Sequence, residues 1–64
     1  MKLNLTKLKL AMAAKCLSNK GLAERIDIPY PTLTPYLNGT REPKPELLGK
    51  IAKALDVYPA ELID

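Results

Sequence analysis

The stretch Leu22-Ala-Glu-Arg-Ile-Asp-Ile28, followed five residues later by Leu33, decides the fold of this chain. Ala23 is small enough to let two helices approach closely. Asp27 stands four residues on, where the chain needs a left-handed turn residue, and Asp tolerates that conformation better than most residues with a side chain. Ile28 and Leu33 then point inward and hold a second helix across the first. This spacing is that of a helix-turn-helix.

Apolar residues recur at helical spacing on both sides of this stretch. The stripes are Leu5, Leu8 and Met12; Leu22, Ala23 and Ile26; Leu33, Tyr36 and Leu37; Leu48, Ile51, Ala52 and Leu55; and Leu62 with Ile63. Ser18 is a good N-cap, and Pro45 and Pro59 can occupy first-turn positions, where a proline is tolerated. No alternating strand pattern competes. We therefore expect an all-α, compact five-helix bundle, one domain over residues 1–64, with the helix-turn-helix at about 18–38.

The composition argues against catalytic and metal sites. A chain of 64 residues buries only about 60% of its unfolded surface, so a deep substrate cleft is hard to build. Histidine is absent and Cys16 is the only cysteine, so no Ser–His or Cys–His pair, no zinc site and no internal disulfide are expected. We expect no enzyme, no cofactor, no metal and no small-molecule substrate.

The first residues could be mistaken for a lipoprotein signal peptide, because Leu10-Ala-Met-Ala-Ala14 precedes Cys16. Lys7, Lys9 and Lys15 interrupt this stretch, and the longest apolar run is far shorter than a membrane span. We interpret the segment as an amphipathic helix. The protein is expected to be soluble and cytoplasmic, with no membrane partner.

The charges are unevenly distributed along the chain. Residues 1–25 carry six basic side chains and one acidic side chain, whereas residues 26–64 carry four basic and six acidic ones. Such a basic field is compatible with a polyanionic partner, and equally with a solubilising surface. Charge alone does not choose between these two interpretations.

The helix-turn-helix residues also resemble a known family, the Cro/repressor (XRE) family of bacterial and phage regulators. The similar segments are Leu17-Ser-Asn-Lys-Gly-Leu-Ala-Glu-Arg-Ile-Asp-Ile28, then Leu37-Asn-Gly39, Pro43, and Ile51-Ala-Lys-Ala-Leu55 with Val57. The resemblance covers residues 5–63. It implies a lambda-repressor-like bundle, binding of a homodimer to operator double-stranded DNA, and transcriptional regulation, with repression as the expected mode.

The resemblance further implies which residues meet DNA. Bases in the major groove would be read by the third helix, through Tyr30, Pro31, Thr34 and Pro35. Phosphates, whose contacts position a protein without conveying sequence, would be held by Asn19, Asn38, Thr40, Arg41 and Lys44. Tyr36 is expected to belong to the core instead, because its position faces the first helix.

Several positions depart from the family pattern. Cys16, Asp27 and Asp56 stand where the family often has a left-handed glycine, which should cost on the order of 1 kcal/mol each. Pro29 replaces the usual serine N-cap. Gly49 interrupts a helix, at a cost of about 1 kcal/mol.

The third helix leaves two alternatives open. If it starts at Pro31, Pro35 removes one intrahelical hydrogen bond and bends the helix; if Thr32 is the N-cap, Pro35 lies in the first turn of a short helix. These prolines, and the lack of Gln, Arg and Lys on the reading face, favour a rival function. In that rival, the helix-turn-helix is a scaffold for binding proteins and does not read DNA.

Overall fold

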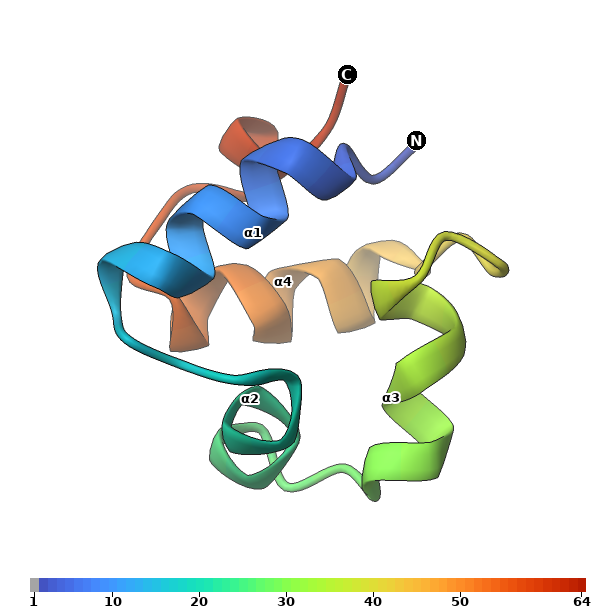
Figure 1. Cartoon of the computed structure of the whole chain (residues 1–64). Coiled ribbons are helices and arrows are strands. Elements are labelled where there is room, and N and C mark those ends of the chain that lie inside the picture. Colours follow the sequence, from blue (N-terminus) through green and yellow to red (C-terminus); the bar gives the residue numbers. More distant parts are fainter. Residues whose placement is uncertain (1) are drawn as a thin grey trace.

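Within residues 2–64, which the computed structural model describes, four α-helices follow one another and a 3-10 turn closes the chain (Figure 1). They are α1 (Leu5–Ala14), α2 (Asn19–Arg25), α3 (Tyr30–Leu37), α4 (Pro45–Ala54) and η1 (Pro59–Leu62). The all-helical prediction is confirmed, but the expected count of five helices is not, because the fifth element is only the short 3-10 helix η1. Only the four-residue η1 forms there, because Ile63 is already extended (φ −117°, ψ 162°) and forms an isolated bridge with Leu3.

The helix starts divide into two kinds. Two have side-chain caps: the Asn4 Oδ1 accepts from the Lys7 amide at 3.0 Å, and the Ser18 Oγ accepts from the Gly21 amide at 3.0 Å. Such a cap satisfies one of the amide groups that a helix start leaves unpaired. Helices α3 and α4 have no side-chain cap and instead carry a proline in the first turn. A proline is suited to this place, since it has no amide to leave unpaired.

Three of the helical segments end in the same left-handed turn without glycine. The turn residues are Cys16, Asp27 and Asp56, with φ of 55°, 58° and 58°. In each turn the amide of the residue that follows donates a hydrogen bond of 3.0 Å to the carbonyl five residues earlier. These bonds run from Leu17 to Met12, from Ile28 to Ala23 and from Val57 to Ala52. This is a Schellman arrangement, which satisfies carbonyl groups that the helix end leaves free. The expected left-handed geometry at these three positions is confirmed.

Helix α3 takes a course close to the first of the two alternatives. It begins at Tyr30, so that Pro31 lies in its first turn and Pro35 lies inside it. Pro35 has no amide to offer to the carbonyl of Pro31, so one intrahelical hydrogen bond is absent from this helix. Thr32 is therefore not the N-cap of this helix, which is Pro29.

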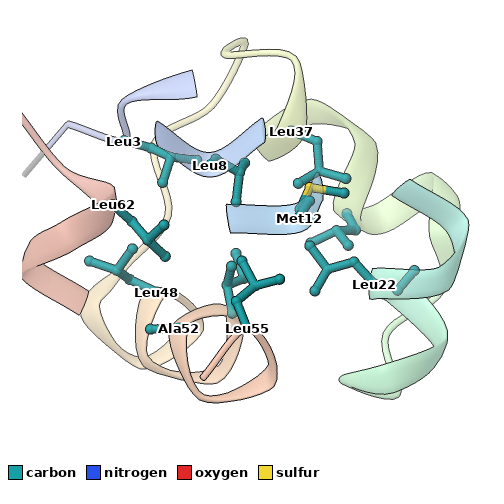
Figure 2. Packing of buried hydrophobic residues seen from close by; sticks show 12 residues of the cluster. Leu3, Leu8, Met12, Leu22, Leu37, Leu48, Ala52, Leu55 and Leu62 are labelled. Atoms are coloured by element: carbon teal, nitrogen blue, oxygen red, sulfur yellow. The ribbon is translucent and has the colours of Figure 1, made fainter. Parts of the chain in front are cut away.

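The core is made of aliphatic side chains from every helical element. Figure 2 shows the labelled side chains converging from α1, α2, α3, α4 and η1 into one cluster. The buried members are Leu3, Leu8, Met12, Leu22, Ala23, Leu33, Leu37, Leu48, Ile51, Ala52, Leu55 and Leu62. Full burial of one such Leu or Ile contributes about 1.5–3 kcal/mol. Among residues 2–64 no polar or charged residue is buried, so the fold is held by apolar packing.

The two ends of the described chain lie on the same side of the molecule (Figure 1), and an isolated bridge between Leu3 and Ile63 joins them. The Asn4 amide donates to the carbonyl of Leu62 at 2.7 Å, and the Asn4 Nδ2 donates to the Asp64 Oδ1 at 2.8 Å. The Asp64 amide in turn donates to the carbonyl of Lys2 at 3.2 Å. We call residues 2–4 and 62–64 the terminal clasp.

None of the helices within residues 2–64 combines the length and the apolar character that a bilayer crossing requires.

Candidate nucleic-acid interface

Helices α2 and α3 form the helix-turn-helix that the sequence predicts. Ala23 is 2% exposed and Leu33 is completely buried. The small side chain of Ala23 lets the two helices approach closely, and the side chain of Leu33 packs between them. Between them Asp27 adopts the left-handed turn, and the Ile28 amide is bonded to the Ala23 carbonyl. Figure 1 shows α3 at one side of the molecule, with α2 beside the turn that enters it. The α2–α3 unit is therefore a rigid support for the outer face of α3.

The four residues expected to read bases all lie on α3, at two levels of exposure. Tyr30, which is 39% exposed, and Pro31 reach solvent, whereas Thr34 and Pro35 are half-buried. The Thr34 Oγ1 donates to the Tyr30 carbonyl at 2.8 Å. The Thr34 hydroxyl therefore keeps only its lone pairs for an outside partner in this conformation.

The five residues expected to contact phosphates are exposed and come from three places in the fold. Asn19 is the first residue of α2, where free amide groups attract anions. Asn38, Thr40 and Arg41 follow α3, and Lys44 immediately precedes α4. The sequence places Asn19 at the start of a helix and Thr40, Arg41 and Lys44 in the loop, and the structure agrees. Asn38, which was expected on the third helix near its end, is the C-cap residue of α3.

The loop after α3 holds two contacts that sequence reasoning missed. The Asn38 Oδ1 accepts from both the amide and the hydroxyl of Thr40, at 3.1 and 2.7 Å, which leaves the Asn38 side-chain NH₂ as its free donor. The guanidinium of Arg41 lies 5.5 Å from the centre of the Tyr36 ring, a cation–π distance. Tyr36 is half-buried against the core, as expected, and also supports Arg41. An Asn-Gly pair signals a turn, but no sequence signal indicates the stacking of Arg41.

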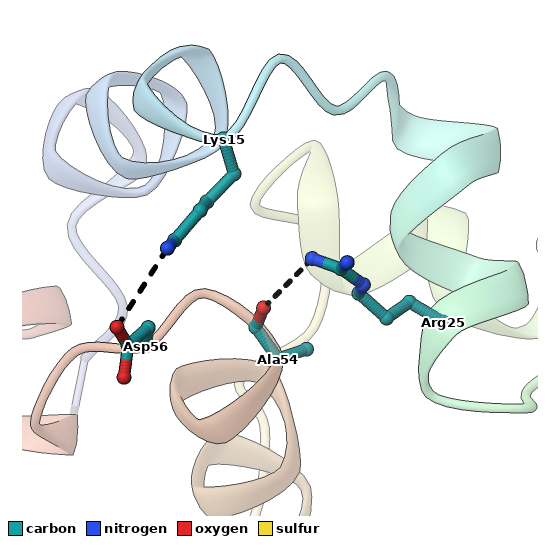
Figure 3. Close-up of polar contacts among 4 residues, drawn as sticks. All are labelled: Lys15, Arg25, Ala54 and Asp56. Atoms are coloured by element: carbon teal, nitrogen blue, oxygen red, sulfur yellow. Dashed lines mark hydrogen bonds and ion pairs between the residues drawn. The ribbon is translucent and has the colours of Figure 1, made fainter.

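The basic side chains near this surface are not neutralised by neighbouring carboxylates. In the part of the chain that the structure describes, the ion pair is Lys15 with Asp56, at 3.6 Å, on the α1 and α4 ends (Figure 3). Lys20, Arg41 and Lys44 make no ion pair within residues 2–64. Their charges are available to an outside anion.

Acidic, cysteine and histidine side chains do not gather into a metal-binding group of three or more anywhere in residues 2–64. Cys16 is exposed and is not in a disulfide.

Comparison with known proteins agrees with this geometry. A family model described as Helix-turn-helix matches residues 8–62, from within α1 to the last residue of η1. No curated protein and no solved structure matches the chain.

Proposed function

The chain belongs to the Cro/repressor (XRE) family of helix-turn-helix DNA-binding domains, and from this premise we propose that it represses transcription by binding operator DNA as a homodimer. The family supports a DNA-binding regulator in general. The observation that carries the proposal is the α2–α3 unit, which presents α3 outward between exposed residues suited to phosphates.

In this proposal α3 enters the major groove and reads bases with Tyr30, Pro31, Thr34 and Pro35. Tyr30 and Thr34 offer hydroxyl groups, and the two proline rings offer apolar contact, for which the thymine methyl is the natural partner. Such a face should favour sites containing A·T pairs. Each lost base contact should cost about 1–3 kcal/mol at one position of the site.

The phosphate contacts flank this face. We assign them to Asn19 at the start of α2, to Asn38, Thr40 and Arg41 after α3, and to Lys44 before α4. For Thr40 this requires that its hydroxyl turns away from the Asn38 Oδ1, to which it donates in the free protein. Ring support for Arg41 from Tyr36 limits the conformations of the guanidinium before DNA binds. A side chain that is already ordered loses less entropy on binding.

The homodimer is proposed for the side of the molecule that carries η1. Tyr58 is 79% exposed and Leu10 is 66% exposed, the two highest values among the large apolar residues of the described chain. Leu10 also lines a depression of about 490 Å³ together with Val57 and Leu62. One small domain buries little surface on DNA, whereas two copies on half-sites one helical turn apart bind jointly. Sedimentation of the protein and of its Tyr58→Ser variant, with and without selected DNA, tests this; a strict 1:1 complex on every duplex contradicts it.

The central experiment is a selection of binding sites from a random duplex library, followed by fluorescence polarisation over a range of salt concentrations. Arg41→Ala should weaken binding to all sequences alike and reduce the slope of log affinity against log salt by about one unit. Lys9→Ala, which removes an equal charge from an exposed position on α1, is the matched control. Tyr30→Ala and Thr34→Ala should instead change the preferred bases.

The rival function, a protein-binding scaffold, rests on the prolines of α3. Pro35 removes a helix hydrogen bond, and the face lacks the long polar side chains that read bases well. If the library yields no preferred site, and affinity for duplex DNA stays at the nonspecific level, the rival replaces the proposal.

A further inference from the structure

A basic depression lies between the C-terminal parts of α2 and α4, and none of its residues comes from α3 or the loop that follows it. It has a volume of about 460 Å³ and is lined by Arg25, Ile26, Lys50, Lys53 and Ala54. From these residues we infer a docking site for a short acidic segment of a partner protein, one that carries an apolar side chain between carboxylates.

The charges around this depression have no internal anionic partner. Arg25, Lys50 and Lys53 are exposed, and none of them is ion-paired within residues 2–64. Arg25 donates one hydrogen bond from Nη1 to the Ala54 carbonyl, at 3.4 Å (Figure 3). The other donors of this guanidinium remain free, and a carboxylate is the group that its planar fork fits best.

Stabilisation of helix ends explains only part of this cluster. Arg25 and Lys53 lie in the last turns of α2 and α4, where a cation interacts favourably with the helix dipole. Lys50 lies before the last turn of α4. Because Lys50, Lys53 and Ala54 are spaced by three and four residues, they share one face of the helix. The interaction with the helix dipole therefore does not account for the positive charge of Lys50 on this face.

The floor of the depression is apolar, and this favours a peptide over a nucleic acid. Ile26 and Ala54 are half-buried, and the aliphatic stems of the two lysines extend the apolar surface beside them. A peptide can bury a side chain on this floor, whereas a sugar-phosphate backbone has none to offer.

The test uses the ¹⁵N-labelled full chain and a blocked pentapeptide, Asp-Glu-Leu-Glu-Asp, followed by amide chemical shifts. We expect the amides of Ile26, Lys50 and Ala54 to move most. Lys50→Gln and Lys53→Gln should each weaken binding about two- to fivefold, the range of exposed ion pairs. Lys9→Gln is the matched control, since it removes an equal charge from an exposed position on α1, and should leave the affinity unchanged.

Two further probes decide what the depression recognises. Asp-Glu-Gly-Glu-Asp, which has the same charge without the apolar side chain, should bind more weakly; equal binding overturns the inference, because the floor then contributes nothing. Random-sequence duplex DNA should move amides of α3 and leave Lys50 and Lys53 unaffected. If DNA moves the Lys50 and Lys53 amides instead, or the peptide causes no localised shifts, the docking site is wrong whatever the outcome for operator binding.

Discussion

Helices α3 and α4 follow one another in the chain and both begin without a side-chain cap, yet they are built for different purposes. Helix α4 places Leu48, Ile51 and Ala52 on one buried stripe and turns its charged residues outward. Helix α3 buries Leu33 and Leu37 and devotes the rest of its surface to tyrosine, threonine and proline. The first sequence is that of a core helix, and the second combines two buried leucines with an outer surface rich in tyrosine, threonine and proline.

The two helices also differ in the residue that is unfavourable for helix formation and in what that residue costs. Helix α3 carries Pro35 in its interior, whereas the irregularity of α4 is Gly49, on a face where an added Cβ meets no atom within 4 Å. The proline removes a hydrogen bond, and the glycine only adds freedom to the unfolded chain. Substitutions in the two helices can therefore test whether α4 carries stability and α3 carries specificity.

The largest effect is expected at the centre of α4. Ile51 is completely buried, so Ile51→Ala should cost about 2–5 kcal/mol through lost burial and the cavity left behind. A domain this small has little stability to lose, and much of the variant should be unfolded at room temperature. Circular dichroism with urea unfolding measures this. The neighbouring Lys50→Ala should change stability by no more than about 0.5 kcal/mol; equal losses in both variants contradict the assignment of α4 as a core helix.

The next effect is expected in α3 and has the opposite sign. Pro35→Ala supplies the amide that the Pro31 carbonyl lacks, and a proline inside a helix costs about 3 kcal/mol relative to alanine. Greater freedom of the unfolded chain offsets about 0.4–1 kcal/mol of that gain. We expect a net stabilisation of about 2–2.6 kcal/mol, measured by urea unfolding, together with altered base preference in the site selection. Pro31→Ala, in the first turn, should change stability little; a destabilised Pro35→Ala shows that packing of the ring outweighs the missing bond.

A smaller gain is expected from Gly49→Ala in α4. The new methyl group meets no atom within 4 Å, so the change should stabilise the protein by about 0.5–1 kcal/mol through helix propensity alone. Thermal unfolding checks this. Gly39→Ala is the contrasting variant, because Gly39 has φ 84° and its Cβ would lie 3.0 Å from the Leu5 Cδ1. That change should destabilise, and a loss of stability in Gly49→Ala contradicts the open face of α4.

The smallest changes in stability are expected from substitutions in two turns, the one before α3 and the one after α4. Asp27 and Asp56 both have φ 58°, so replacement by glycine relieves backbone strain at each, by up to about 1 kcal/mol. Asp56→Gly should gain less, because it also removes the exposed ion pair with Lys15, worth about 0.2–1 kcal/mol. Parallel urea titrations at low salt and at 1 M NaCl separate the two contributions. A difference between the variants that persists at high salt has another cause than the ion pair.

The contrast between the two helices also explains what the sequence could predict. The stripe of α4 is periodic, so its buried residues were predictable, and the spacing from Ala23 to Leu33 predicted the helix-turn-helix. The burial of Leu3 was missed, and Leu5 and Ile26, which were expected in buried stripes, are only half-buried. The start of α3 was not predictable, because Pro31 and Pro35 left two starts open, and the helix begins at Tyr30, one residue before the earlier of them. The last element is shorter than expected because Ile63 pairs with Leu3, and this pairing depends on the opposite end of the chain.

The candidate site was predictable as a set of positions but not as a set of interactions. Exposure of Asn19, Arg41 and Lys44 follows from their places at helix starts and in a loop. Sequence spacing does not reveal that the Thr34 proton is donated to the Tyr30 carbonyl, or that the Arg41 guanidinium lies over Tyr36. These depend on side-chain rotamers, which local sequence restricts without determining.

The terminal clasp has a consequence for the order in which the structure forms and opens. Asn4 caps α1 through its Oδ1 and holds Asp64 through its Nδ2, so one side chain links the first turn of α1 to a residue 60 positions away. Closing so long a loop is entropically unfavourable until the helices between have packed, so the clasp should form late in folding. In the native state it should open as a unit, with the amides of Asn4 and Asp64 exchanging their hydrogens together and before those of α4. Fraying at either end is thereby transmitted to the other.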